Sequence, residues 1–382
     1  MAFRTIDLVA LGPPPVDPYE PWATAWALAS AFAARGDRVQ VYHPDGPAGA
    51  EPPTGTLGVP VRLPLRRPGA AQDEAGFAAA AGRRVRLDAD LVIRDPAGFG
   101  SLGLAGRRTG RPRTVAVARS VELHAFDRER ASRSSPRLVE RLDTWRDRRT
   151  VRRLEQIALN EADLIFSDAP ELARALAEEY GLADRRLRPT VPPVPTLPSN
   201  TSRDAARSAL EIPTDVPVVV APMAERRAEP AGVDRACEAF RRVRPFFPGA
   251  RLVVVGATAP PDPGVVSVPG RDHGTFALGL SAAQVALFAG RRPGFDPLLV
   301  SAMRVGCVPA AVPGVRLPVD PEGAVRYAAS DDVGDLASVL AELLADPALC
   351  REIAARGEGQ AARYLPERVV DGVDAALGTV GG

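Results

Sequence analysis

The sequence predicts an α/β protein with two doubly wound parallel-sheet domains and a ligand cleft between them. The chain has 382 residues, enough for two domains that each bury a core. Short apolar runs alternate with helical patterns along almost all of it, which is typical of parallel sheets covered by helices. The alternation breaks at 189–204, PTVPPVPTLPSNTSRD, and then restarts. We therefore predict a first domain at 1–190, a linker at 191–204 and a second domain at 205–365, with a helix in 366–382 that crosses back to the first domain.

The first half contains the expected strand and helix patterns in alternation. RTIDLVAL at 4–11 is predicted to be the first strand, and the segment at 21–36 an amphipathic helix that stops at Gly36. Apolar runs then predict further strands at 38–43, 90–95 and 114–119. The segment at 152–168 is predicted to be a helix followed by a strand.

The second half repeats the pattern after the linker. A predicted strand at 216–223 leads into a helix at 232–247, and a second helix is expected at 297–305. The tail carries two helical segments, at 332–357 and 366–378. Further strands are predicted at 251–256, 265–270 and 284–289. In such sheets ligands bind at the carboxyl ends of the strands, which would face the cleft.

Composition excludes several classes of protein. All 48 basic residues are arginine, so a Schiff-base lysine, a pyridoxal phosphate anchor and a Walker lysine are absent. The formal net charge of +1 gives no general attraction to nucleic acid. The three cysteines and three histidines lack the spacing of metal ligands, so we expect no metal site. No apolar run is long enough to cross a membrane and no signal peptide is recognisable, which predicts a cytoplasmic protein.

Three further stretches each have two interpretations. GFGSLG at 98–103 has the glycine spacing of a dinucleotide-binding loop, with Glu122 at roughly the distance of a ribose-binding acid, but it follows a later strand and could be an ordinary loop. The loop after the first strand contains Tyr19, Glu20 and Trp22, which predict either a wall of a ligand site or, with Trp26, core packing. The arginine-rich segment at 128–153 is either a solvated helix or a basic face for an anionic acceptor or a membrane surface.

Several stretches, in order, resemble one family. They are ALASAFAARGDRVQVYHP, IALNEADLIFSDAPELARALAEEYGLADRRLRPTVPP, the pair VVVAPM and GVDRACEAFRRVRPFFPGARLVVVG, GFDPLLVSAMRVGCVPAAVPG, and DVGDLASVLAELLADPALCREIAARG. Together they are similar to the retaining glycosyltransferases of family 4, which have the GT-B fold. The resemblance implies transfer of a sugar from a nucleotide diphosphate sugar, such as a UDP- or GDP-sugar, without a bound metal or other cofactor.

The polar residues that the resemblance implies at the donor site are mostly replaced. The two family glutamates on the donor helix fall on Pro293 and Ser301, and a family lysine falls on Ala231. We expect Asp296, Arg226 and His124 to carry out the catalytic roles. The donor would be held by Arg226, Arg227, Gly270, Arg271, Gly294, Phe295, Asp296 and Ser301, with Arg291 and Arg292 nearby; the acceptor would be held by Tyr19, Glu20, Trp22, Arg119 and His124.

Two functions follow from these residues. The first is a divergent retaining glycosyltransferase that acts on a small-molecule or glycan acceptor in bacterial natural-product or surface-glycan assembly. The second is a catalytically inactive relative that serves as a binding or scaffold subunit for an active partner glycosyltransferase. The sequence leaves open the base, the sugar, the acceptor, peripheral membrane contact and self-association.

Overall fold

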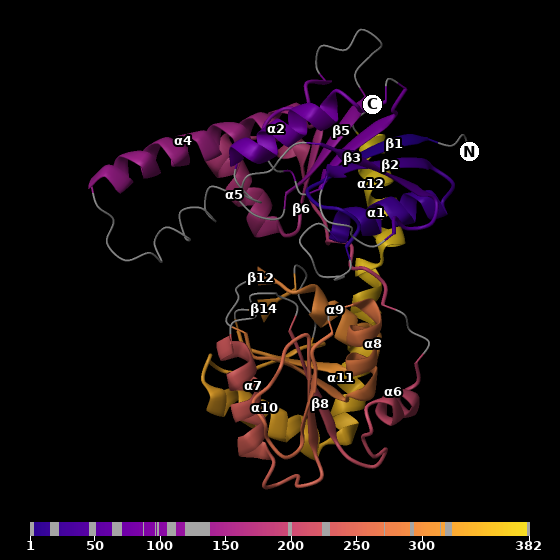
Figure 1. Cartoon of the computed structure of the whole chain (residues 1–382), viewed down its shortest axis with the longest axis vertical. Helices are drawn as coiled ribbons and strands as arrows, with labels where there is room; N and C mark the ends of the chain where they lie inside the picture. Colours follow the sequence, from indigo (N-terminus) through magenta and orange to yellow (C-terminus); the bar gives the residue numbers. More distant parts are fainter. Residues whose placement is uncertain are drawn as a thin grey trace. The chain divides into compact units, whose positions relative to one another are not determined.

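A computed structural model shows two parallel α/β units (Figure 1). The first unit contains the described residues up to Pro193 together with the last helix, and the second unit runs from Val194 to Leu365. The structure describes residues 4–15, 23–45, 51–62, 71–86, 88–95, 97, 99–104, 112–118, 138–197, 201–223, 230–270, 272–290, 294–313, 315–317 and 323–379.

The first unit is a seven-stranded parallel sheet in the order β3-β2-β1-β4-β5-β6-β7. The strands are β1 (Thr5–Ala10), β2 (Arg38–Pro44), β3 (Thr56–Val61), β4 (Leu91–Asp95), β5 (Arg113–Ala118), β6 (Leu164–Ser167) and β7 (Leu187–Pro189). The helices are α1 (Ala23–Ala34), α2 (Ala71–Gly82), α4 (Leu138–Glu161), α5 (Pro170–Tyr180) and α12 (Pro366–Thr379).

Helices cover both faces of this sheet. α1 and α12 pack on one face, and α2, α4 and α5 pack on the other (Figure 1). The sequence predicted an amphipathic helix here, but α1 is not amphipathic. The reason is that α12 covers the side of α1 that the sheet leaves open. Charged groups also hold α12 in place: Arg4 and Arg35 both donate to Asp374, at 2.6 and 2.7 Å. Helix α12 therefore belongs to the first unit.

The second unit is a six-stranded parallel sheet in the order β10-β9-β8-β11-β13-β15, with a two-stranded ribbon β12-β14 beside it. The strands are β8 (Val218–Pro222), β9 (Arg251–Val255), β10 (Val265–Val268), β11 (Val285–Phe288), β12 (Gly294–Phe295), β13 (Val308–Ala311), β14 (Val315–Arg316) and β15 (Arg326–Tyr327). The helices are α6 (Arg203–Ala209), α7 (Pro230–Val243), α8 (His273–Ala282), α9 (Pro297–Arg304), α10 (Val333–Ala345) and α11 (Pro347–Ala361), with a short 3-10 helix at Ala362–Tyr364.

Two local predictions are corrected. The helical segment at 332–357 is two helices, because Pro347 lacks an N–H and Asp346 caps the second helix by accepting from the amides of Ala348 and Leu349, each at 2.9 Å. Strand β3 and helix α2 were missed; β3 is an edge strand, and its proline and glycine hide the strand pattern.

None of the described helices is both long enough and apolar enough to cross a bilayer. In the same part of the chain, no group of three or more His, Cys, Asp or Glu side chains is placed to hold a metal ion.

Candidate functional site

The strand order of the second unit reverses between β8 and β11. From β8 the chain builds outward to β9 and β10, and α8 then brings it back to β11 on the other side of β8. In parallel sheets the ligand site lies at the carboxyl ends of the two strands that flank such a reversal. The candidate donor site is therefore the edge formed by the residues that follow Pro222 and Phe288.

Two helices begin at this edge. Helix α7 begins at Pro230 and α9 begins at Pro297. A Cβ added to Gly232, in the first turn of α7, would lie 3.7 Å from the Cα of Gly290, just beyond β11. The first turn of α7 thus lies close to Gly290. The helix dipole makes such helix ends favourable positions for an anion.

Asp296 is the N-cap of α9. Its carboxylate accepts a hydrogen bond from the amide of Leu298 at 2.9 Å, and the proline that follows it starts the helix. Phe295 precedes it in β12, which pairs with β14. The structure therefore gives Asp296 a structural role that the sequence pattern did not predict.

Ser301 lies inside α9 and is 2% exposed. The residues around it in the same helix, from Leu298 to Met303, are also buried. A glutamate at this position of the resembling family would need room for a charged group, whereas this chain places a small neutral side chain in a closely packed environment.

The turn after β10 is tight at Gly270. A Cβ there would lie only 2.6 Å from Oγ1 of Thr275. Asp272 caps α8 by accepting from the amide of Thr275 at 2.9 Å and from its hydroxyl at 2.6 Å, and these bonds hold the pKa of Asp272 below its ordinary value. Gly270 and the first turn of α8 are thus closely packed against each other.

Glycine also lets the chain pass closely after β9. Gly256 has a φ of +83°, and a Cβ on it would lie 2.4 Å from the carbonyl oxygen of Met223. Met223 follows β8, so this glycine allows the segments after β8 and β9 to approach each other.

The other predicted site residues lie outside the described residues. They are Tyr19, Glu20, Trp22, Arg119, His124, Arg226, Arg227 and Arg271, with Arg291, Arg292 and Pro293. Of the predicted donor residues, Gly294, Phe295, Asp296 and Ser301 lie together on β12 and α9, and Gly270 lies on the turn after β10. Trp26 is a core residue: it is 2% exposed, and its indole N–H donates to the carbonyl of Gly12 at 3.1 Å.

The glycine-rich loop at 98–103 is not a dinucleotide site in the residues that the structure describes. The carboxylate of Glu161 accepts from the amide of Leu102 at 2.6 Å, the amide of Leu104 at 3.1 Å and the hydroxyl of Ser101 at 3.1 Å. These are the donors that a phosphate would need, so a side chain of α4 already occupies the anion position.

Arg94 holds the same loop from the strand side. Its guanidinium donates to the carbonyls of Gly100 at 2.7 Å and Phe99 at 3.1 Å. The side chain is buried, and burial lowers its pKa to about 10 despite the opposing effect of Glu161 and Glu74. Sequence reasoning missed Arg94 and Glu161, because their partners are backbone groups that no side-chain pattern reveals.

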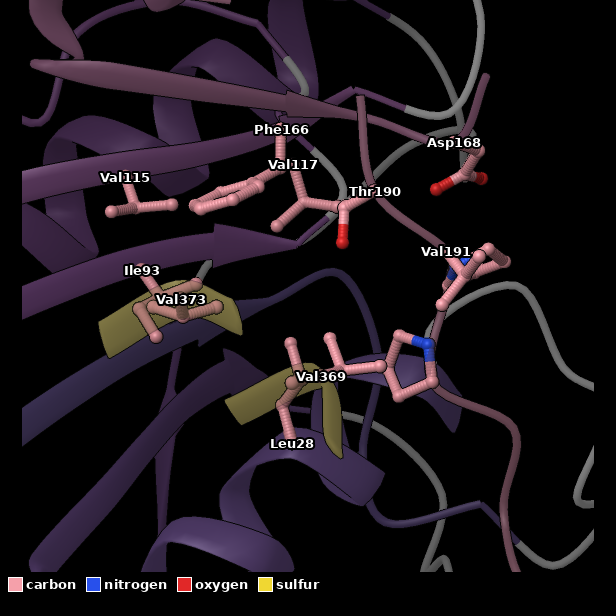
Figure 2. Close-up of a pocket in the computed structure, with 12 residues that line it drawn as sticks. Leu28, Ile93, Val115, Val117, Phe166, Asp168, Thr190, Val191, Val369 and Val373 are labelled. Carbon is pink, nitrogen blue, oxygen red and sulfur yellow. The ribbon is translucent and has the colours of Figure 1, made fainter. Parts of the chain in front are cut away.

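A small apolar cavity lies in the first unit between α12 and the sheet (Figure 2). Val369 and Val373 of α12 face Ile93, Val117 and Phe166 of the strands across it. Asp168 and Thr190 contribute its polar side chains. A cavity with this lining carries no cation for a diphosphate, so it is not a donor site.

Comparisons with known proteins agree with the architecture. Residues 23–196 match the sequence profile of the family described as Glycosyltransferase Family 4. A search of curated proteins found no matching sequence.

Solved structures that match the whole chain show the same fold. A sucrose-phosphate synthase from Thermosynechococcus elongatus is 19% identical with a TM-score of 0.66, covering 99% of both chains. WaaG, a glycosyltransferase of lipopolysaccharide biosynthesis, is 15% identical with a TM-score of 0.67, covering 96% of this chain and 98% of its own. HepE from Anabaena, solved with UDP and glucose, is 13% identical with a TM-score of 0.65, covering 98% of this chain and 100% of its own.

The family match falls on the first unit, and the structural matches extend over both. Residues 23–196 thus resemble a Glycosyltransferase Family 4 domain, and the chain as a whole shares the GT-B-like fold of these solved structures.

Proposed function

We propose that this chain transfers a sugar from a nucleotide diphosphate sugar to an acceptor, and that the donor binds in the second unit at the start of α9. The observation that carries the proposal is that the first turn of α7 lies close to Gly290, just beyond β11, at the strand reversal of the sheet. The departing diphosphate gains negative charge during transfer, and helix N-termini at this edge would stabilise that charge.

The structural relatives support the choice of donor. HepE has been solved with UDP and with UDP-glucose, at 14% identity to this chain in each case. A nucleotide bound in the second unit of this chain would place its diphosphate at the N-terminus of α9. Its base would then lie toward Gly270, where backbone peptide groups would recognise it.

The remaining roles follow from this position of the donor. Arg226 and Arg227 would supply the positive charge that the missing family lysine supplies elsewhere. The sugar would lie against Gly294, Phe295 and Asp296. Arg271 would contact the base, Ser301 would contribute at most a weak polar contact, and Tyr19, Glu20, Trp22, Arg119 and His124 would bind the acceptor.

The same proposal includes a retaining mechanism and a cytoplasmic role in bacterial natural-product or surface-glycan assembly. Without a carboxylate at the two family positions, we assign no general base, and the departing phosphate would accept the acceptor's proton. An anomeric NMR assignment of the product, compared with the donor, tests retention directly.

A catalytically inactive scaffold remains the second candidate, and one observation favours it. No residue of α9 from Pro297 to Arg304 is acidic, and the carboxylate of Asp296, just before it, caps the helix. The usual carboxylate partners of sugar and ribose hydroxyls are thus missing from this helix, and each loss costs about 1.5–3 kcal/mol of donor binding.

Calorimetric titration of the folded protein with UDP, GDP, dTDP and ADP, without added metal, separates the two candidates. Micromolar binding of one nucleotide supports the transferase and identifies the donor class to screen. An absence of binding to all four rules out the transferase proposal. Arg226→Ala should weaken the observed binding at least tenfold, and an unchanged affinity would remove that residue from the proposed site.

A further inference from the structure

Phe295, the residue just before the cap of α9, stacks on the ring of Tyr364. The ring centroids are 5.8 Å apart and the planes are only 6° from parallel. Tyr364 is 1% exposed, so its ring has a fixed position within the second unit. The stack joins β12, at the candidate donor site, to a residue 69 positions further along the chain.

Tyr364 is itself held by the segment through which the chain enters the second unit. Its carbonyl accepts a hydrogen bond from the amide of Val194 at 2.9 Å. It is the last residue of the short 3-10 helix, just ahead of Leu365, where the second unit ends. Tyr364, on which Phe295 stacks, thus lies where the segments that enter and leave this unit are hydrogen-bonded to each other.

The same two segments hold α9 at its other end and along its side. Arg304, the last residue of α9, donates to the hydroxyl of Thr196 at 3.3 Å. A Cβ on Gly357 of α11 would lie 3.2 Å from the side chain of Met303, so α11 packs closely under α9. Helix α9 is therefore fixed at both ends and from below, and the stack holds its N-terminal end together with the pairing of β12 and β14.

We propose that Tyr364 is a positioning residue for the donor, acting through Phe295. Because Phe295 directly precedes Asp296, the position of its ring sets where the capping carboxylate and the N-terminal end of the α9 dipole point. That helix end is the part of α9 that meets the diphosphate in the function proposed above, on which this inference rests. Loss of the stack leaves the fold intact and misdirects the helix N-terminus.

Hydrogen–deuterium exchange of the full chain without ligand tests the positioning. In Tyr364→Leu, the amides of 298–300 should exchange faster than in the wild type, while Tyr364→Phe, which keeps the ring, should restore the wild-type rate. Thr196→Val breaks the tie at the other end of α9 and should leave 298–300 unchanged. If Tyr364→Leu does not fold, Phe295→Leu removes the same stack from the more exposed side and should give the same acceleration.

Titration with UDP adds the functional readout. Loss of the stack should weaken UDP binding roughly 3- to 10-fold, the effect expected for one aromatic pair, and Tyr364→Phe should bind like the wild type. Unchanged exchange at 298–300 in both leucine variants would overturn the positioning role. A wild-type protein that binds no nucleotide would defeat the proposed function alone, since the exchange experiment still decides what the stack does.

Discussion

Asp296 combines a cap with a proposed sugar contact, and two substitutions separate these roles. Its carboxylate accepts from the amide of Leu298 at 2.9 Å. Asparagine presents an acceptor oxygen in the same place, so Asp296→Asn should change the free energy of unfolding by less than about 0.5 kcal/mol. Asp296→Ala leaves the amide without its partner and should cost about 1 kcal/mol. For a unit of this size, that loss lowers Tm by about 2–4 °C in a thermal denaturation followed by circular dichroism.

Donor turnover should not separate the two variants in the way that stability does. If the carboxylate also holds a sugar hydroxyl, both variants lose a charge-assisted hydrogen bond worth about 1.5–3 kcal/mol. Both should then show kcat/KM reduced about 10- to 150-fold, although only the alanine variant is less stable. Full kcat/KM in Asp296→Asn would show that Asp296 is a cap and nothing more. Equal instability of the two variants would refute the cap.

Three other changes test the remaining features. Burial lowers the pKa of His43 below its ordinary value of 6.5, so the unfolded state takes up the proton first as the pH falls. The free energy of unfolding should therefore be full above about pH 6.5 and decrease as the pH drops below it. His43→Phe should flatten this dependence when urea unfolding is compared at about pH 7.5 and about pH 5. Glu161→Ala should cost about 2 kcal/mol and expose the loop at 99–104 to limited proteolysis, whereas an unchanged cleavage pattern would contradict its role. Ser301→Glu places a charge at a residue 2% exposed and should cost about 3 kcal/mol of unfolding free energy; a stable variant with tighter nucleotide binding would show that the position is open to the donor.

Sequence periodicity was sufficient to predict the two sheets. Strands such as 251–256 and 284–289 differ from β9 and β11 by a residue at one or both ends, because a buried parallel strand is a continuous apolar run. The errors occurred where a single residue overrides a pattern. Pro347 divides one apparent helix into α10 and α11, and Pro60 with Gly58 conceals the edge strand β3.

The candidate site was less predictable, because its decisive interactions join distant parts of the chain through the backbone. The glycine spacing at 98–103 suggested a phosphate loop, yet Glu161 of α4 occupies the anion position. The sequence singled out Phe295 beside the donor helix but gave no reason to connect it with Tyr364. Such pairs depend on tertiary packing, and only the folded arrangement reveals them.

The missing glutamates have a different meaning once the packing of α9 is known. Ser301 sits in a helix whose residues from Leu298 to Met303 are all buried, so the replacement of a carboxylate there agrees with the surrounding apolar packing. The start of the same helix remains capped by Asp296 and supported by the Phe295–Tyr364 stack. Loss of side-chain contacts for hydroxyl groups thus coexists with a well-supported helix N-terminus. This combination favours recognition of the donor mainly through its diphosphate and backbone contacts, and it makes nucleotide binding the measurement that decides between enzyme and scaffold.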